Sequence, residues 1–202
     1  MTSFDLSFDY RCPFAKNIHL HVLRALDAGA EFSVNFVPWT MSQGYKDEGA
    51  PDVWNDPAHD ADLLSLAASI SVRDQQPALF LWVHEALFRA RHERAIRLVT
   101  LEELEGVLAP LGVDVALVKD DLASRRPHAV IGESFLKFAK FEAFGVPTFV
   151  VGDDATFVRY MKPPTGDAED SIKLIESIVT LIAAQPELNE FKHCLLYTSR
   201  CV

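Results

Sequence analysis

The first forty residues alternate between strand and helix patterns, and this order limits how the chain can fold. Aromatic and large apolar residues alternate with polar ones over residues 3–10, which predicts a strand. Apolar residues at helical spacing predict a helix over residues 14–28, and a second alternating run predicts a strand over residues 31–39. A right-handed crossover would make the two strands parallel neighbours in one sheet.

Cys12 lies where the first strand passes into the helix. Pro13 follows it, and proline is favoured at the first helical position because its missing N–H would have no partner there. A helix N-terminus offers unpaired N–H groups and about half a positive charge, and both favour a thiolate. We therefore expect Cys12 to have a lowered pKa and to act as a nucleophile, the alternative being an ordinary buried thiol.

The rest of the chain predicts a helical block, then a strand hairpin, then a final helix. Residues 41–57 are rich in Gly, Pro, Asp and Asn, and we expect a loop there. The expected helices span residues 61–72, 77–91, 101–111, 115–124, 132–144 and 171–184. The expected strands span residues 148–151 and 155–161, with a tight turn between them at Gly152.

The order β-α-β, helical block, β-β-α predicts an α/β chain with a thioredoxin-like fold and an inserted all-helical subdomain. The thioredoxin-like domain would comprise residues 1–40 and 140–190, and the insertion residues 58–139. Two motifs in this order, Arg11-Cys12-Pro13-Phe14-Ala15 and Gly145-Val146-Pro147-Thr148, resemble the DsbA-like thioredoxin-domain family. Related branches are the chromene-carboxylate isomerases and the kappa-class glutathione transferases. The resemblance extends to about Glu190.

The resemblance implies where the site lies and what it binds. Cys12 would be the catalytic residue, and Pro147 would be a cis-proline beside it. The backbone of Val146 would then pair with a thiol peptide as an added strand. The residues expected to bind substrate are Pro13, Phe14, Ala15, Val146 and Pro147.

Ala15 departs from the Cys-x-x-Cys motif of the redox members of this family. It stands where the second cysteine would be, so nothing inside the motif can resolve a mixed disulfide on Cys12. We therefore expect a monothiol oxidoreductase with no tightly bound cofactor, which uses glutathione or another low-molecular-weight thiol as co-substrate. Its partner would be a small electrophile or disulfide. The alternatives are a transferase or isomerase of the related branches, or a non-enzymatic binding module.

Several other side chains bear on the site. Tyr10 and Arg11 flank Cys12, and either is a candidate to donate to a bound carboxylate. His84 and His92 are eight residues apart and share roughly one helix face, which we expect to be solvated or part of an interface, the alternative being that it lines a cleft. The histidines and cysteines show no metal-binding spacing, so no metal site is expected. Trp82 and Phe88 are expected in the core.

Charge and composition limit the classes of partner and the cellular compartment that we expect for this protein. The formal net charge of -10 argues against nucleic acid or an anionic membrane as a main partner. A run of apolar residues long enough to span a membrane is absent, and the N-terminal residues do not resemble a secretory signal. We therefore expect a cytoplasmic protein, and the sequence is compatible with a homodimer.

The last nine residues, 194–202, are expected to be foreign to the native chain. The string Cys194 to Ser199 can be encoded by the mosaic-end adaptor of transposase-based sequencing libraries, and we interpret this tail as translated adaptor rather than a native polar tail. Its removal takes away Cys194 and Cys201 and leaves Cys12 as the one cysteine of the folded chain. A single thiol cannot form an intramolecular disulfide, which fits a reducing compartment.

Overall fold

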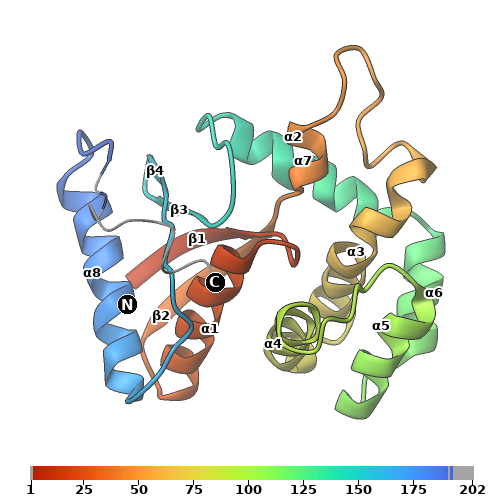
Figure 1. The fold of residues 1–202 in the computed structure, drawn as a ribbon, viewed down its shortest axis with the longest axis horizontal. Helices are drawn as coiled ribbons and strands as arrows, with labels where there is room; N and C mark the ends of the chain where they lie inside the picture. The colour runs from red at the N-terminus through yellow and green to blue at the C-terminus, as the bar shows by residue number, and fades with distance from the viewer. Residues whose placement is uncertain (1, 191, 193–202) are drawn as a thin grey trace.

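A computed structural model describes residues 2–190 and 192 of the chain (Figure 1). Its centre is a four-stranded sheet in the order β2-β1-β3-β4. Helices α1 (Pro13–Asp27) and α8 (Ala168–Ala184) pack against each other beside this sheet. A group of further helices forms the other half of the molecule, on the right in Figure 1. The expected α/β thioredoxin-like fold with an inserted helical region is confirmed.

The sheet is mixed, and its centre is the strand that leads to Cys12. Strand β1 (Thr2–Phe8) pairs in parallel with β2 (Phe32–Pro38), as the crossover rule predicts. On its other side, β1 pairs antiparallel with β3 (Thr148–Val151), which forms a hairpin with β4 (Asp154–Phe157). The hairpin therefore lies directly beside the strand that ends at the candidate site.

The helical half is built from five of the remaining helices, and one more turn of helix lies within the expected loop. These elements are α2 (Met41–Gly44), α3 (Asp60–Gln75), α4 (Phe80–His92), α5 (Leu101–Leu108), α6 (Val115–Ala123) and α7 (Arg126–Ala139). Helix α2 exists because the Thr40 hydroxyl accepts a hydrogen bond from the N–H of Ser42 over 3.2 Å, which caps the turn. Short 3-10 turns cover Pro57–His59, Pro77–Leu79 and Ala109–Leu111.

Both predicted ends of one helix were wrong. Helix α7 begins at Arg126, six residues before the expected start at Gly132, and ends at Ala139 instead of Phe144. Pro127 lies in its first turn, where a missing N–H costs nothing. Arg125, just before it, has a left-handed φ of 60°, so the chain reverses there. Residues 140–147 then leave the helix and lead into β3.

The core lies between β1, α1 and α4 and is rich in aromatic rings. Phe8 contacts the rings of Tyr10, His19 and Phe88 with centroid separations of 5.2 to 6.4 Å. Phe88 is buried, as expected. The expectation for Trp82 was wrong, because its side chain is 62% exposed on the outer side of α4.

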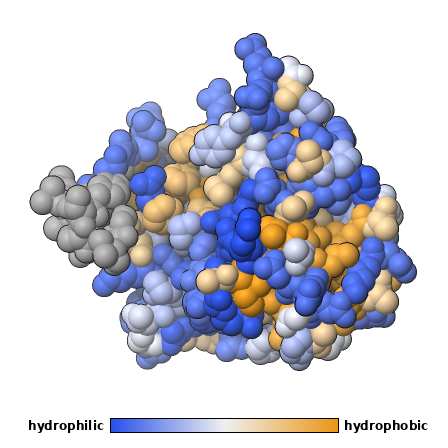
Figure 2. Space-filling model, turned by 45° about the vertical axis from the view of Figure 1, so that its right-hand side comes forward, coloured by the Kyte–Doolittle hydropathy of each residue, from blue (hydrophilic) through white to orange (hydrophobic). Residues whose placement is uncertain are grey.

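The outer surface of the helical half is not uniformly polar. Figure 2, in which this half is turned forward, shows an apolar area between hydrophilic residues. Leu101 on α5 and Leu117 on α6 are among the exposed apolar residues of this half. No helix within residues 2–190 and 192 is both long enough and apolar enough to span a membrane. The proposed adaptor tail, residues 194–202, lies outside the described residues.

Candidate functional site

The site is centred on Cys12, the N-cap residue of α1. Its backbone is extended, with φ -88° and ψ 118°, so its side chain folds back over the first turn of the helix. The sulfur accepts a hydrogen bond from the N–H of Ala15 over 3.5 Å. The thiol donates to the carbonyl oxygen of Val146 over 3.2 Å, and the Val146–Pro147 peptide bond is cis. The two motifs therefore meet in space, although 134 residues separate Cys12 from Val146.

The electrostatic surroundings of Cys12 differ from our expectation. Burial raises the pKa of the thiol, and this is the largest effect. The N–H groups of Ala15 and Phe14 lower the pKa, the Asp9 carboxylate raises it and the Arg159 guanidinium lowers it. The net pKa is raised, so the predicted lowering was wrong for this state. A desolvated sulfur whose proton bonds to a carbonyl favours the neutral thiol.

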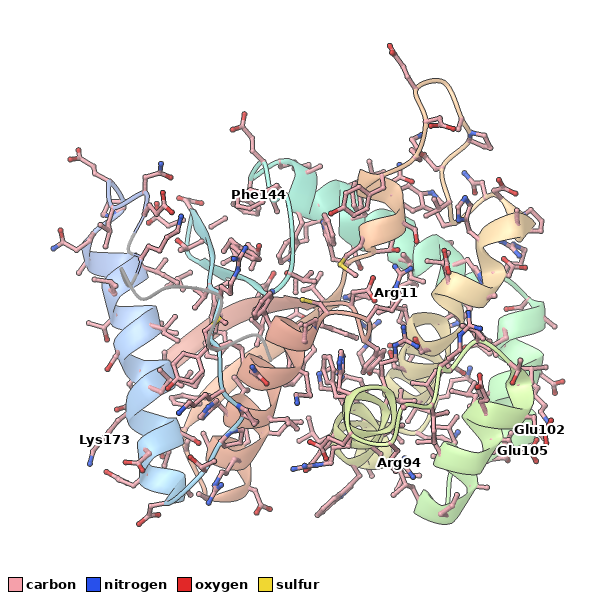
Figure 3. The ribbon with its side chains drawn as sticks, viewed as in Figure 1. Arg11, Arg94, Glu102, Glu105, Phe144 and Lys173 are labelled. Carbon is pink, nitrogen blue, oxygen red and sulfur yellow. The ribbon has the colours of Figure 1, made fainter. Side chains whose placement is uncertain are left out.

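A cleft of about 390 Å³ opens over Cys12. Tyr45, which follows α2, and Phe144, which lies between α7 and β3, line it although they are 86% and 77% exposed. Figure 3 shows Phe144 on the segment after α7, with Arg11 nearer to α3. The lining residues are Arg11, Cys12, Pro13, Phe14, Trp39, Met41, Gly44, Tyr45, Phe144, Gly145, Val146, Phe157 and Arg159.

The predicted substrate-binding residues take different places in this site. Pro13, Phe14 and Val146 line the cleft. Ala15 is fully buried in the first turn of α1, and its part is the N–H that reaches the sulfur. The carbonyl of Pro147 accepts the N–H of Val158 over 3.0 Å, which joins Pro147 to the end of the hairpin.

Arg11 lines the cleft, but most of its donors are already bound within the protein. Its Nε and Nη2 groups donate to the Asp9 carboxylate, with distances down to 2.6 Å. Nη2 also reaches Thr40 over 3.2 Å, and Nη1 donates to Ser42 over 2.9 Å and lies 3.6 Å from Asp62. These hydrogen bonds use four of the five N–H groups of the guanidinium, and the contact with Asp62 is an ion pair.

Tyr10 is turned away from the cleft. Its ring is fully buried, and its hydroxyl pairs with Nδ1 of His84 over 2.8 Å. His84 is buried as well, so our expectation of a solvated or cleft-lining face was wrong for this residue. His92 is half-buried, and its Nε2 donates to the carbonyl oxygen of Tyr10 over 2.8 Å.

Arg159 is a cleft residue that our sequence analysis missed. Its guanidinium lies 5.0 Å from the ring centroid of Phe14 and 5.8 Å from that of Phe157, in cation–π geometry. The hairpin register explains its place, because Thr148 pairs with Phe157 and Val158 bonds to Pro147. Counting outward from the predicted turn at Gly152 would have placed residue 159 opposite Val146.

The described residues contain no group of three or more His, Cys, Asp or Glu side chains that could hold a metal ion.

Comparison with known proteins places the chain among thioredoxin-fold proteins. Residues 4–163 match the model of the DSBA-like thioredoxin domain family. A search of curated proteins finds no match. Several solved structures share the fold. One is the cytosolic disulfide reductase DsbM from Pseudomonas aeruginosa with GSH, with a TM-score of 0.61 and 14% identity over 89% of this chain and 100% of that one.

Two further structures have similar scores. MdbA, a thiol-disulfide oxidoreductase from Actinomyces oris, has a TM-score of 0.61 and 19% identity, covering 86% of this chain and 78% of that one. Pseudomonas aeruginosa DsbA has a TM-score of 0.58 and 19% identity, covering 90% and 84%. At these identities the structures show a shared fold.

Proposed function

Because the chain belongs to the DSBA-like thioredoxin domain family, we propose that Cys12 performs thiol–disulfide exchange as a monothiol, with an external small thiol as its partner. The family and its structural neighbours are thiol-disulfide oxidoreductases. The observation that carries the monothiol proposal is the place of Ala15. Its N–H lies 3.5 Å from the Cys12 sulfur, at the position where a second cysteine would have to act, and it has no sulfur.

The proposed cycle has two exchange steps. In the first, the Cys12 thiolate attacks one sulfur of a small disulfide, that disulfide bond breaks, and the other half leaves as a thiolate. In the second, the thiolate of an external thiol attacks the substrate sulfur of the mixed disulfide and releases the Cys12 thiolate. One thiol replaces another in the disulfide, so the cycle consumes no further oxidant or reductant.

The shape and charge of the cleft favour a small substrate. A volume of about 390 Å³ lies within the range of small-molecule sites. Arg159 provides a positive group at the cleft, and Tyr45 and Phe144 provide exposed aromatic surface. Glutathione fits as the external thiol because it carries carboxylates that a guanidinium recognises. A structural neighbour, DsbM, was solved with GSH.

We also propose that the protein works in the cytoplasm. Cys12 has no partner cysteine in residues 2–190, which suits a reducing compartment. The DsbM neighbour is described as cytosolic.

A second candidate function is supported by the raised pKa of Cys12. In a transferase or isomerase of the kappa-class or chromene-carboxylate branches, the bound external thiolate would be the nucleophile. Cys12 would then remain a neutral thiol, and its S–H would donate to the bound sulfur instead of to Val146. This function needs no mixed disulfide on Cys12.

One experiment separates these functions. The protein is prepared with Cys194→Ser and Cys201→Ser so that Cys12 is the only thiol, and it is incubated with oxidised glutathione. Intact mass spectrometry should show one glutathione adduct, and reduced glutathione should remove it. The adduct should be absent from the Cys12→Ser variant.

The opposite result would decide against the monothiol proposal. If the adduct fails to form although the protein binds reduced glutathione, and glutathione-dependent conjugation survives in Cys12→Ser, then the transferase or isomerase candidate is correct. If the protein neither reacts with nor binds any small thiol or disulfide tested, the scaffold is a binding module.

A further inference from the structure

Helix α4 contacts Tyr10 at two points, its backbone carbonyl and its side-chain hydroxyl. The backbone carbonyl of Tyr10 accepts a hydrogen bond from Nε2 of His92 over 2.8 Å. Its hydroxyl lies 2.8 Å from Nδ1 of His84. Tyr10 is fully buried and stands two residues before Cys12, so both contacts act on the segment that presents the thiol.

The hydroxyl contact is one link in a buried chain of hydrogen bonds. A carbonyl oxygen can only accept, so Nε2 of His19 donates to the oxygen of Ser7 over 3.1 Å. Nδ1 of the neutral His19 ring then accepts from Nε2 of His84 over 2.8 Å. Nδ1 of His84 in turn accepts the proton of the Tyr10 hydroxyl. One arrangement of protons therefore satisfies every group.

Burial keeps these groups neutral. It lowers the pKa of His19 to about 3 and the pKa of His84 well below its ordinary value, and it raises the pKa of Tyr10. This series of hydrogen bonds connects β1, α1 and α4 to one another. A fully satisfied buried network of this kind specifies one packing of the elements that it joins.

Side chains of the turn from Asp9 to Cys12 also contact the start of α2: the Asp9 carboxylate accepts from the N–H of Met41 over 3.1 Å, and Arg11 donates to Thr40 and Ser42. The N–H of Cys12 donates to the carbonyl of Asp9 over 3.0 Å, and the N–H of Arg11 donates to the Asp9 carboxylate over 2.9 Å. Both bonds are internal to the turn. The bond from His92 to the carbonyl of Tyr10 ties the backbone of this turn to helix α4, more than 80 residues away.

We propose that His92, supported by His84, is a positioning residue for Cys12, through which the helical half holds the thiol at the start of α1. This inference rests on the proposed function only in assigning chemistry to Cys12. Loss of the His92 bond would let the turn move, and the sulfur would leave the Ala15 N–H and the Val146 carbonyl. Small displacements of a reacting group reduce rates strongly, by up to about 100-fold per ångström.

The test compares three variants in the background with serine at positions 194 and 201. His92→Leu removes the donor, and His92→Gln places an amide N–H close to the Nε2 position. Trp82→Gln alters the exposed side of the same helix. The readouts are the pH profile of Cys12 alkylation by iodoacetamide and the rate of exchange with oxidised glutathione divided by the thiolate fraction.

In His92→Leu we expect the alkylation midpoint to move down towards the ordinary cysteine value of about 8.5, because the sulfur becomes solvated. We expect the exchange rate per thiolate to fall by about tenfold. His92→Gln should restore both readouts, and Trp82→Gln should leave them as in the parent. The charged neighbours of His92, namely Asp9, Lys16 and Arg91, are unchanged in all variants.

Two results would overturn the inference. One is an unaltered pH profile in a folded His92→Leu variant, and the other is a His92→Gln variant that behaves like His92→Leu. If His92→Leu fails to fold, His92→Asn replaces it, because its shorter amide occupies the Nδ1 position and cannot reach Tyr10. If the parent does not exchange with oxidised glutathione, the proposed function fails, but the alkylation profile still tests the positioning role.

Discussion

The thiol of Cys12 donates its proton to the carbonyl oxygen of Val146 over 3.2 Å, so the groups expected to bind a substrate bind each other in this structure. The site is therefore closed, in the sense that the Cys12 thiol occupies the carbonyl oxygen of Val146. An incoming ligand has to take the place of the thiol at this carbonyl if it is to bind there. The neutral thiol is the form that fits the closed site, since a thiolate has no proton to donate.

The closed site predicts a slow thiol at neutral pH. Burial raises the pKa of Cys12, so alkylation by iodoacetamide should have its midpoint above the ordinary value of about 8.5 and should rise throughout the neutral range. Arg159 lowers this pKa, so Arg159→Met should slow alkylation at pH 8, by roughly threefold. A matched control is Lys173→Met, because Lys173 lies on the outer side of α8 (Figure 3). A midpoint below that of a free cysteine would contradict this prediction.

Ala15→Cys should convert the monothiol site into a dithiol site. The backbone N–H of Ala15 is 3.5 Å from the Cys12 sulfur, so a sulfur on residue 15 lies within reach of a disulfide after a small rotation. We expect the oxidised variant, with serine at positions 194 and 201, to have no thiol that reacts with iodoacetamide, whereas the parent has one. We also expect it to oxidise a reduced dithiol peptide at a rate well above that of the parent. Ala15→Ser should keep one reactive thiol, at Cys12, and the double variant Cys12→Ser with Ala15→Cys should keep one, at position 15; neither should oxidise the peptide faster than the parent does. Two reactive thiols in the oxidised Ala15→Cys variant would refute the geometry.

The sequence predicted the frame of this fold well, because its periodic patterns belong to single elements. The Thr148–Val151 strand was predicted with its observed bounds, and α1 to within one residue at each end. The start of α7 was missed because Arg125 reverses the chain with a left-handed φ, which nothing in its residue type indicates. The place of Arg159 could have been obtained by counting the hairpin register from Gly152.

The buried polar groups could not be predicted in the same way. His84 pairs with Tyr10 and His19, which are 74 and 65 residues away, and the burial of histidine is intermediate, so its residue type alone does not indicate a buried position. The raised pKa of Cys12 is also a tertiary effect. Its helix position was predicted correctly, but the burial that outweighs it comes from the segments folded around the sulfur.

Acid should destabilise the protein through its buried histidines. His19 has a folded pKa of about 3 against about 6.5 when unfolded, and His84 is lowered as well. Between these values the unfolded state binds more protons, so the free energy of unfolding falls as the pH falls below about 6.5. Each histidine contributes a slope of up to about 1.4 kcal/mol per pH unit. Urea unfolding at pH 8, 6.5, 5.5 and 4.5 measures this slope.

The variant His84→Phe separates the contribution of His84 to stability at pH 8 from its contribution to acid destabilisation. At pH 8 it should lower the free energy of unfolding by about 2–3 kcal/mol, because the Tyr10 hydroxyl and His19 Nδ1 lose their partner. Below pH 6.5 the free energy of unfolding of this variant should depend less steeply on pH than that of the parent, by the amount that corresponds to about one bound proton. An unchanged slope would show that His84 is not the neutral buried group described here.

Two glycines in helices should respond to alanine in opposite directions. A Cβ at Gly132 on α7 would lie 2.7 Å from Nε1 and 2.8 Å from Cε2 of the buried Trp54 ring. The Trp54 ring also packs against the ring of Phe135, with centroids 5.6 Å apart, which limits how far it can move aside. The clash should outweigh the gain in helix propensity, and Gly132→Ala should lower the free energy of unfolding by about 1–3 kcal/mol.

Gly106 on α5 is the matched control, because a Cβ there meets nothing within 4 Å and the residue is exposed. Gly106→Ala should raise the free energy of unfolding by about 0.5–1 kcal/mol, which is the helix propensity difference alone. Urea unfolding at pH 8 measures both variants against the parent. If Gly132→Ala stabilises the protein as much as Gly106→Ala does, the close approach of Trp54 to α7 is wrong.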